Sequence, residues 1–242
     1  MRIAIMQPTY LPWMGYFALI DQVDTFVILD DVEYNHRSWQ QRNRVKTNNG
    51  ITWLTVPVIT SGKSGQLIKS AEINQNEKWE KSHFKTIKFN YASADYFDDI
   101  ISPLKSVYNE DWEMLLELNE TLISLLSEKL GLHANFVRSS DLNADGSKAY
   151  RLVNICNEVG ANEYLSPLGS KGYIEADNPF PKAGIDLLYQ NFEHPTYSQL
   201  HGEFVSHMSA VDLLFNEGPR SLEVIRAGEE VPYTSEEARE IE

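Results

Sequence analysis

The sequence has a single cysteine, Cys156, among its 242 residues, and it has no long apolar run. One thiol cannot form an intrachain disulfide, a cysteine-rich zinc site or an iron–sulfur cluster, and it fits a reducing compartment. The apolar runs are only a handful of residues long, whereas a membrane-spanning helix needs about 20. Because Met1 leads directly into a strand-like segment and not into a signal-peptide core, the sequence predicts a cytoplasmic protein without a membrane span.

Basic residues are in the minority, with 21 Lys and Arg against 35 Asp and Glu, for a formal charge of −14. This charge repels polyanions, so we expect no nucleic-acid partner. The hydrophobic content of 42% is typical of a soluble globular protein and not of a disordered one. The length suits one large domain. We expect a single α/β domain over residues 1–227 and an acidic tail or loose helix over residues 228–242.

Several common site signatures are missing as well. The sequence contains no GxGxxG after its first apolar segment, no GxxxxGK[ST] and no GxSxG. Its six histidines show no HExxH or comparable ligand spacing, so we predict no metal site. These absences remove the usual support for dinucleotide binding, P-loop chemistry and serine hydrolysis, and they leave any cofactor undefined.

The first thirty residues are typical of a βαβ unit. Two apolar runs, residues 3–6 and 26–29, flank a segment over residues 13–22 whose apolar residues have helical spacing. The strands of such a unit are parallel, and ligands bind at their carboxyl ends. The polar residues expected at that edge of the sheet are Gln7, Thr9, Tyr10, Asp30 and Asp31.

A hairpin is predicted next, because Asn48-Asn49-Gly50 is a strong turn signal between arms at residues 39–47 and 51–58. Alternation places Arg42, Arg44 and Lys46 on one face. Apolar spacing then predicts helices near residues 77–91, 110–130, 147–160 and 209–216, and short strands at 163–166 and 185–192. The predicted fold class is therefore α/β: a Rossmann-like parallel sheet flanked by helices, with a β-hairpin insertion after the second strand and a mostly helical second half.

Three residues are candidates for catalysis: Asp30, Asp31 and His36. A carboxylate at the end of a strand could bind a ribose hydroxyl, hold a divalent cation or act as a base, although a turn explains the Asp-Asp pair equally well. Only one of the two should face the cleft, because adjacent side chains of a strand point to opposite sides. His36 could exchange a proton near neutral pH, or it could simply be a surface residue.

Four cations lie within ten residues, at Arg37, Arg42, Arg44 and Lys46. Such a cluster could hold a phosphate or a carboxylate, which Arg grips with two hydrogen bonds, or it could be the solvent face of an edge strand. Later in the chain, Tyr197, Gln199, Asp212 and Asn216 could complete a pocket, although Ser209 and Asp212 also resemble a helix cap. The full set of predicted substrate-binding residues is Gln7, Thr9, Tyr10, Trp13, Arg37, Trp39, Gln41, Arg42, Asn43, Arg44, Lys46 and Tyr197.

These segments resemble the WbqC-like family of bacterial proteins, which are often encoded with genes for O-antigen and other surface polysaccharides. The resemblance runs from residue 1 to about residue 220 and implies a role in making or modifying an unusual sugar. The segments that carry it are Gln7-Pro8-Thr9-Tyr10-Leu11-Pro12-Trp13, Gly15-Tyr16-Phe17, Leu29-Asp30-Asp31-Val32, Arg37-Ser38-Trp39-Gln40-Gln41-Arg42-Asn43-Arg44, His194-Pro195-Thr196-Tyr197 and Asp212-Leu213-Leu214-Phe215-Asn216.

The residues and the resemblance together predict a transferase that acts on a nucleotide-linked amino sugar in O-antigen or surface-glycan biosynthesis, and that transfers an acyl or aminoacyl group to the sugar amine. The arginines would neutralise the diphosphate, and Tyr10, Trp13 and Trp39 would stack on the base or the sugar. Two alternatives stay open: a glycosyltransferase, and a non-catalytic binding subunit of a polysaccharide-assembly complex. The sequence leaves the oligomeric state open.

Overall fold

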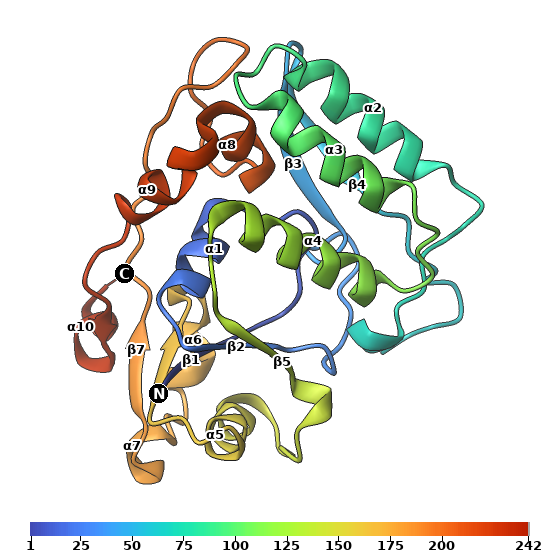
Figure 1. Cartoon of the computed structure of the whole chain (residues 1–242). Helices are drawn as coiled ribbons and strands as arrows, with labels where there is room; N and C mark the ends of the chain where they lie inside the picture. The colour runs from blue at the N-terminus through green and yellow to red at the C-terminus, as the bar shows by residue number, and fades with distance from the viewer. Residues whose placement is uncertain (242) are drawn as a thin grey trace.

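The computed structural model describes residues 1–241 of the chain. One sheet contains β1 (Arg2–Met6), β2 (Thr25–Ile28), β5 (Asn135–Arg138), β6 (Glu163–Ser166), β7 (Asp186–Tyr189) and β8 (Tyr233–Thr234). The strands lie in the order β5-β2-β1-β6-β7-β8 (Figure 1). All are parallel except β8, which pairs antiparallel with β7 at the edge. The structure confirms the predicted parallel sheet, and it places β1 at the point where the strand order reverses.

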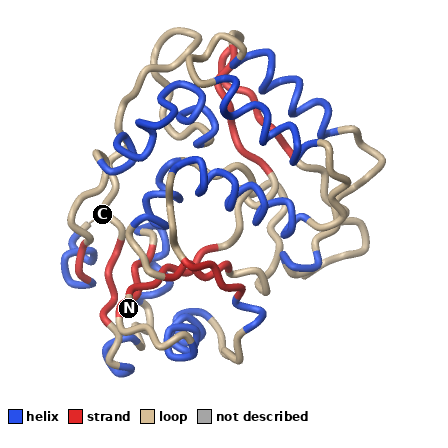
Figure 2. Tube along the Cα trace, viewed as in Figure 1, coloured by secondary structure: helices blue, strands red, loops and turns tan. Residues whose placement is uncertain are grey.

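Helices cover both faces of the sheet (Figure 2). The continuous apolar runs of β1 and β2 fit this arrangement, because Phe26 and Ile28 enter one core while Val27 enters the other. No helix within residues 1–241 combines the length and the apolar character needed to cross a membrane. The first core is covered by α1 (Met14–Asp21), α2 (Trp79–Tyr91), α3 (Phe97–Tyr108), α4 (Leu115–Leu130), α8 (Ala210–Glu217) and α9 (Ser221–Arg226), and the second by α5 (Lys148–Glu158), α6 (Lys171–Glu175), α7 (Phe180–Ala183) and α10 (Ser235–Glu240).

The predicted hairpin is present as a separate two-stranded sheet of β3 (Arg42–Thr47) and β4 (Gly50–Thr55). Val45 and Leu54 on its inner face belong to the first core. The first arm begins at residue 42 and not at 39, because the preceding residues form a turn around Gln41. The side chain of Gln41 accepts a hydrogen bond from the Arg37 N–H and donates one to the Val56 carbonyl, at 2.9 Å each.

The sequence prediction misses α3 and β5. In α3 the buried side chains have helical spacing, but Pro103 interrupts the signal, since proline is disfavoured inside a helix. The helix predicted from residue 110 begins at 115, because the preceding residues are extended and hydrogen-bond to the segment around Glu72. Strand β5 has only four residues and lacks a clear apolar run.

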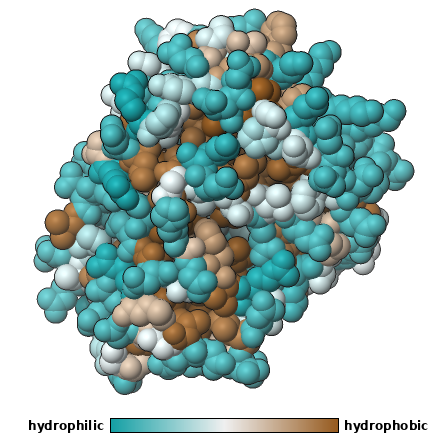
Figure 3. Space-filling model, in the orientation of Figure 1, coloured by the Kyte–Doolittle hydropathy of each residue, from teal (hydrophilic) through white to brown (hydrophobic). Residues whose placement is uncertain are grey.

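The acidic end of the chain, residues 228–242, was expected to be a solvated tail or a loose helix. Its described part, residues 228–241, contains β8 and α10, and residue 242 lies outside the described residues. Thr234 and Glu237 make a reciprocal capping box at the start of α10. Ala238 is fully buried in the second core, and the Lys171 ammonium donates a hydrogen bond to its carbonyl at 3.0 Å. The glutamates of α10 lie on its exposed side. On the face drawn in Figure 3, hydrophilic residues likewise cover most of the surface.

We expect Ala238→Glu to lower the free energy of unfolding by about 3 kcal/mol or more, because it places an unpaired carboxylate in the second core. Urea unfolding measures the change. Ala92→Glu, which makes the same substitution at an exposed position after α2, should stay within about 0.5 kcal/mol. Equal behaviour of the two variants would mean that α10 is not packed as described.

Candidate functional site

A cavity of about 300 Å³ lies at the carboxyl end of β1. Its walls come from the β1–α1 loop, the hairpin and the loop that precedes α8. In open α/β sheets, ligands bind outside the carboxyl ends of the strands, next to the point where the strand order reverses. This cavity is therefore the candidate site. It is lined by Met6, Thr9, Trp13, Tyr16, Trp39, Asn43, Arg44 and His207.

Trp13 forms one wall as part of an aromatic stack. Its ring lies 4.9 Å from that of His207 and 5.9 Å from that of His194, centroid to centroid, with both imidazoles nearly parallel to it. A Cβ atom at Gly15 would lie 2.3 Å from atoms of the indole. Gly15 is therefore required for the tryptophan to lie flat over the start of α1.

His207 is fixed from both sides of its peptide unit. Its N–H donates to His194 Nε2, and its carbonyl accepts from Arg44 Nη2, at 3.0 Å each. It holds a left-handed φ of 59°, a strained conformation that often marks functional residues. Its Nδ1 lies 2.9 Å from Ser206 Oγ, whereas no hydrogen bond within residues 1–241 involves its Nε2.

Burial and a neighbouring charge favour the neutral form of His207. Partial burial and the adjacent Arg44 charge both lower the pKa of His207, because each disfavours the imidazolium form. Burial also lowers the pKa of His194. Because the Nε2 of His194 accepts the hydrogen bond from the His207 N–H, its Nδ1 carries the proton and donates to the Pro195 carbonyl at 2.8 Å. A neutral imidazole with a free Nε2 can accept a proton from a ligand in the cavity.

The arginines divide into two groups. Six of the nine form ion pairs with a carboxylate, namely Arg2, Arg138, Arg151, Arg220, Arg226 and Arg239. The other three, Arg37, Arg42 and Arg44, form none with the residues that the structure describes. Arg42 lies 4.4 Å from the centre of the Trp53 ring, and Arg44 lies 5.5 Å from that of Trp39. Although acidic residues dominate the chain, none within residues 1–241 lies within ion-pairing distance of these three arginines.

Lys46 and Tyr10, both predicted to bind substrate, are buried and have protein partners. The Lys46 ammonium donates to the carbonyls of Gly202 and Glu203, which fastens the loop before α8 to the hairpin. The Tyr10 hydroxyl lies 2.9 Å from His83 Nδ1. Burial raises the pKa of Tyr10 and lowers the pKa of His83 to about 4. His83 is therefore a hydrogen-bonded core residue.

The amide side chains predicted to bind substrate hold loops in place. Asn43 donates to the Leu11 carbonyl at 2.7 Å, and Gln7 accepts from Gln40 at 2.8 Å. Among them only Asn43 lines the cavity, together with the predicted residues Thr9, Trp13, Trp39 and Arg44. His36 and Arg37 are exposed on the turn before the hairpin and lie outside the cavity lining.

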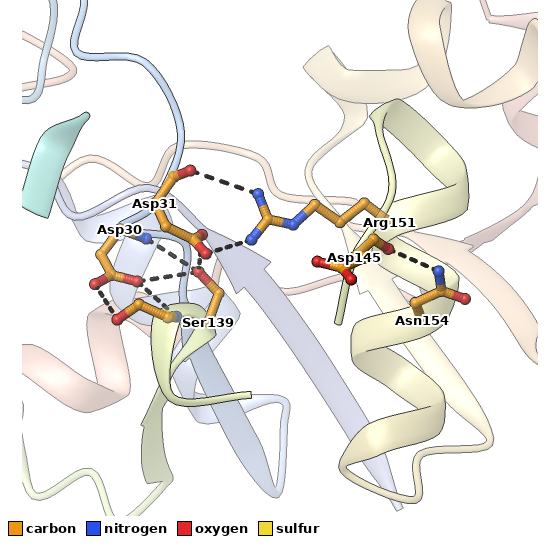
Figure 4. A network of polar contacts seen from close by, with 7 residues as sticks. Asp30, Asp31, Ser139, Asp145, Arg151 and Asn154 are labelled. Carbon is orange, nitrogen blue, oxygen red and sulfur yellow. Dashed lines mark hydrogen bonds and ion pairs between the residues drawn. The ribbon is translucent and has the colours of Figure 1, made fainter. Parts of the chain in front are cut away.

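Asp30 and Asp31 form a separate polar network at the ends of β2 and β5 (Figure 4). Fully buried Asp30 accepts hydrogen bonds from Ser139 Oγ at 3.0 Å and from the Ser140 N–H and hydroxyl at 3.0 and 2.6 Å. Ser139 Oγ also lies within hydrogen-bond distance of Asp31, so the two carboxylates share its single proton, and Asp31 pairs with Arg151 of α5. Burial raises the pKa of Asp31, but the bonds from Ser139 and Arg151 outweigh it and make the net shift downward. Neither carboxylate lines the cavity, and both are engaged by protein groups.

Tyr197, another predicted binding residue, belongs to a buried network around Asp212. This carboxylate accepts hydrogen bonds from Tyr91 at 2.6 Å, Tyr197 at 2.7 Å and Gln199 at 2.9 Å. Ser209 is the N-cap of α8 as predicted, accepting from the Val211 N–H, whereas the Asp212 side chain serves the network and not the cap. The Asn216 amide donates back to the Asp212 carbonyl at 2.7 Å. The network packs the loop before α8 against α2.

Three lining residues are absent from the sequence prediction: Met6, Tyr16 and His207. Met6 and Tyr16 look like ordinary core positions in the sequence. His207 has no spacing signal, because a long loop carries it to the β1–α1 segment. Only the density of polar and turn residues around His194 hints at this region. Within residues 1–241, no group of three or more His, Cys, Asp or Glu side chains could hold a metal ion.

Comparison with known proteins places these residues in a wider context. The family model of the WbqC-like protein family matches residues 7–224, a range that contains every cavity-lining residue except Met6. A protein of Mycobacterium tuberculosis titled "Uncharacterized protein Rv1507c" is 35% identical over 227 residues, which cover 93% of this chain and 97% of that protein. No solved structure matches the chain.

We expect the pKa of His207 to lie below that of an ordinary histidine and to rise in Arg44→Met. The substitution removes a positive charge that disfavours the imidazolium. Titration of histidine ring signals by NMR measures both values. Lys85→Met removes one positive charge from the exposed face of α2 and should leave the His207 titration unchanged. A pKa that stays constant in Arg44→Met would exclude the described proximity.

We expect Lys46→Met to loosen the loop before α8. The variant loses a charged donor to two carbonyls, a contribution of about 1.5–3 kcal/mol, so the amides of Val205 and His207 should exchange roughly 10- to 100-fold faster. Hydrogen exchange followed by NMR measures these rates, and Lys85→Met is again the matched control. Unchanged exchange at both amides would show that Lys46 does not fasten this loop.

Proposed function

The chain belongs to the WbqC-like protein family, and we propose that it is a cytoplasmic transferase acting on a nucleotide-linked amino sugar, with acyl or aminoacyl transfer to the sugar amine in surface-glycan biosynthesis. The observation that carries the proposal is the set of arginines without a carboxylate partner among residues 1–241, namely Arg37, Arg42 and Arg44, the last of which lines the cavity.

The charge distribution favours an anionic ligand. A chain with a formal charge of −14 has carboxylates available, and its other six arginines are paired. Arg44 also has a buried Nε that lacks a hydrogen-bond partner. An unsatisfied buried donor costs about 1–3 kcal/mol. Because this Nε is closed to solvent, a phosphate would bind the terminal Nη groups of the guanidinium, which donate charge-assisted hydrogen bonds. A sugar diphosphate supplies such a phosphate.

The cavity walls favour a sugar ring beside that anion. Trp13 and Trp39 offer flat aromatic surfaces, and Thr9 and Asn43 add polar groups to a mostly apolar lining. This mixture is typical of small-molecule sites, which range from about 300 to 1,000 Å³. At about 300 Å³ the cavity suits one sugar ring.

His207 supports a transfer to an amine or a hydroxyl. In the proposed step, the neutral sugar amine attacks the carbonyl carbon of an activated acyl ester such as a thioester. The new carbon–nitrogen bond forms, the carbon–sulfur bond breaks, and the thiolate leaves with the electron pair. His207 Nε2 accepts the proton that the nitrogen loses, which requires the neutral imidazole described above.

We expect calorimetry with UDP-, GDP- and dTDP-linked amino sugars to detect saturable binding of at least one of them. Arg42→Met should weaken that binding about 10- to 100-fold, the loss of one charged hydrogen bond to phosphate, while Lys85→Met should not. Mass spectrometry of the same sugars after incubation with the protein and cell extract should reveal the mass of the transferred group. No heat with any member of the panel would count decisively against the proposal.

A further inference from the structure

Two tryptophans are exposed side by side next to the cavity. Trp39 keeps 48% of its surface accessible and Trp53 keeps 43%, and their ring centroids lie 5.4 Å apart at an angle of 35°. Large aromatic side chains normally bury much of their surface, so a pair of open indoles on one face is unusual. We call Trp39 and Trp53 the indole platform.

The platform follows from the geometry of the hairpin. Trp53 of β4 lies directly opposite Arg44 of β3, on the face that points away from the first core. Arg42 and Arg44 both lie against the Trp53 ring, at 4.4 and 5.6 Å from its centre. These cation–π contacts hold the arginines near the indoles without consuming their charge, because no carboxylate within the described chain pairs with them.

The platform is continuous with the cavity. Trp39 belongs to both, and Arg44, which lines the cavity, also contacts Trp53. A nucleotide-linked sugar has three parts, namely a sugar, a diphosphate and a nucleoside. A cavity of about 300 Å³ suits the first part alone, so the other two must extend over the adjoining surface.

We propose that the indole platform is the nucleobase subsite of this site, a step that rests on the proposed function. The sugar lies in the cavity, the diphosphate lies at Arg44 and Arg42, and the base stacks on Trp39 and Trp53. Every nucleobase presents a π face, so stacking accepts all of them. The platform therefore selects a nucleotide over a bare sugar phosphate but discriminates little between uracil, guanine and thymine.

The test compares two probes on the same protein. Calorimetry measures the affinity of UDP, which can use the platform, and of glucosamine 1-phosphate, which can reach only the cavity and the arginines. Trp53→Ala should weaken UDP binding about 5- to 150-fold and weaken glucosamine 1-phosphate binding much less, since that probe loses only the support of the arginines. Trp53→Phe should retain most of the UDP affinity. Ile51→Ala trims an exposed apolar side chain on the same face of β4 and should change neither affinity.

The outcomes separate this inference from the function on which it rests. If the wild-type protein binds both probes and Trp53→Ala weakens neither, or weakens both equally, the platform is not a base subsite although the anionic site stands. Binding of glucosamine 1-phosphate without UDP also overturns the subsite and restricts the substrate to a sugar phosphate. Failure of both probes to bind removes the proposed function and the subsite together.

Discussion

The cavity exists because three segments far apart in the sequence are joined by backbone hydrogen bonds. The Tyr10 N–H donates to the Trp39 carbonyl at 3.0 Å, the Ala210 N–H to the Pro12 carbonyl at 2.8 Å, and the Ser209 N–H to the Arg44 carbonyl at 2.9 Å. The β1–α1 loop, the hairpin and the start of α8 thereby form a closed triangle around the site. Backbone bonds do not depend on side-chain identity, so this frame leaves the side chains that face inward free for chemistry.

The same frame explains why a basic segment can persist in an acidic protein. Arg44 is held through its Nη2 bond to the His207 carbonyl, and Arg42 and Arg44 rest on indole rings. A carbonyl and a π face orient a guanidinium and leave its positive charge in place, whereas a carboxylate would neutralise that charge. One residue then serves two purposes, because the charge that would bind an anion also adds to the effect of burial in lowering the pKa of His207, which favours its neutral imidazole.

The sequence predicts the sheet better than it predicts the site. Strands β1 and β2 are uninterrupted apolar runs, so their burial between two helical layers can be read locally. The residues of the site are harder to predict. A polar side chain at the end of a strand can form its hydrogen bonds with a segment whose proximity cannot be predicted from the sequence. Ser139 and Ser140 reach Asp30 from the end of β5, a strand that the prediction misses, and the Gly202 carbonyl reaches Lys46 from a long loop. Conversely, no sequence pattern around His207 indicates that it belongs to the site. The backbone hydrogen bonds described above bring its loop to the cavity.

Whether a polar side chain already has hydrogen-bond partners in the protein therefore separates structural residues from candidate ligand-binding residues better than residue type does. Asp30, Asp31, Lys46 and Asp212 have the chemistry of catalytic groups, yet their oxygens or protons already have protein partners. A ligand would have to break those bonds, and breaking a buried charged bond costs about 1.5–3 kcal/mol or more before any binding is gained. Arg42, Arg44 and the Nε2 of His207 carry no such cost. These residues, which still have hydrogen-bonding groups available for a ligand, lie at the cavity and the indole platform. This shared location, more than the motifs themselves, favours the cavity beside the hairpin over the Asp30–Asp31 network as the place where a ligand binds.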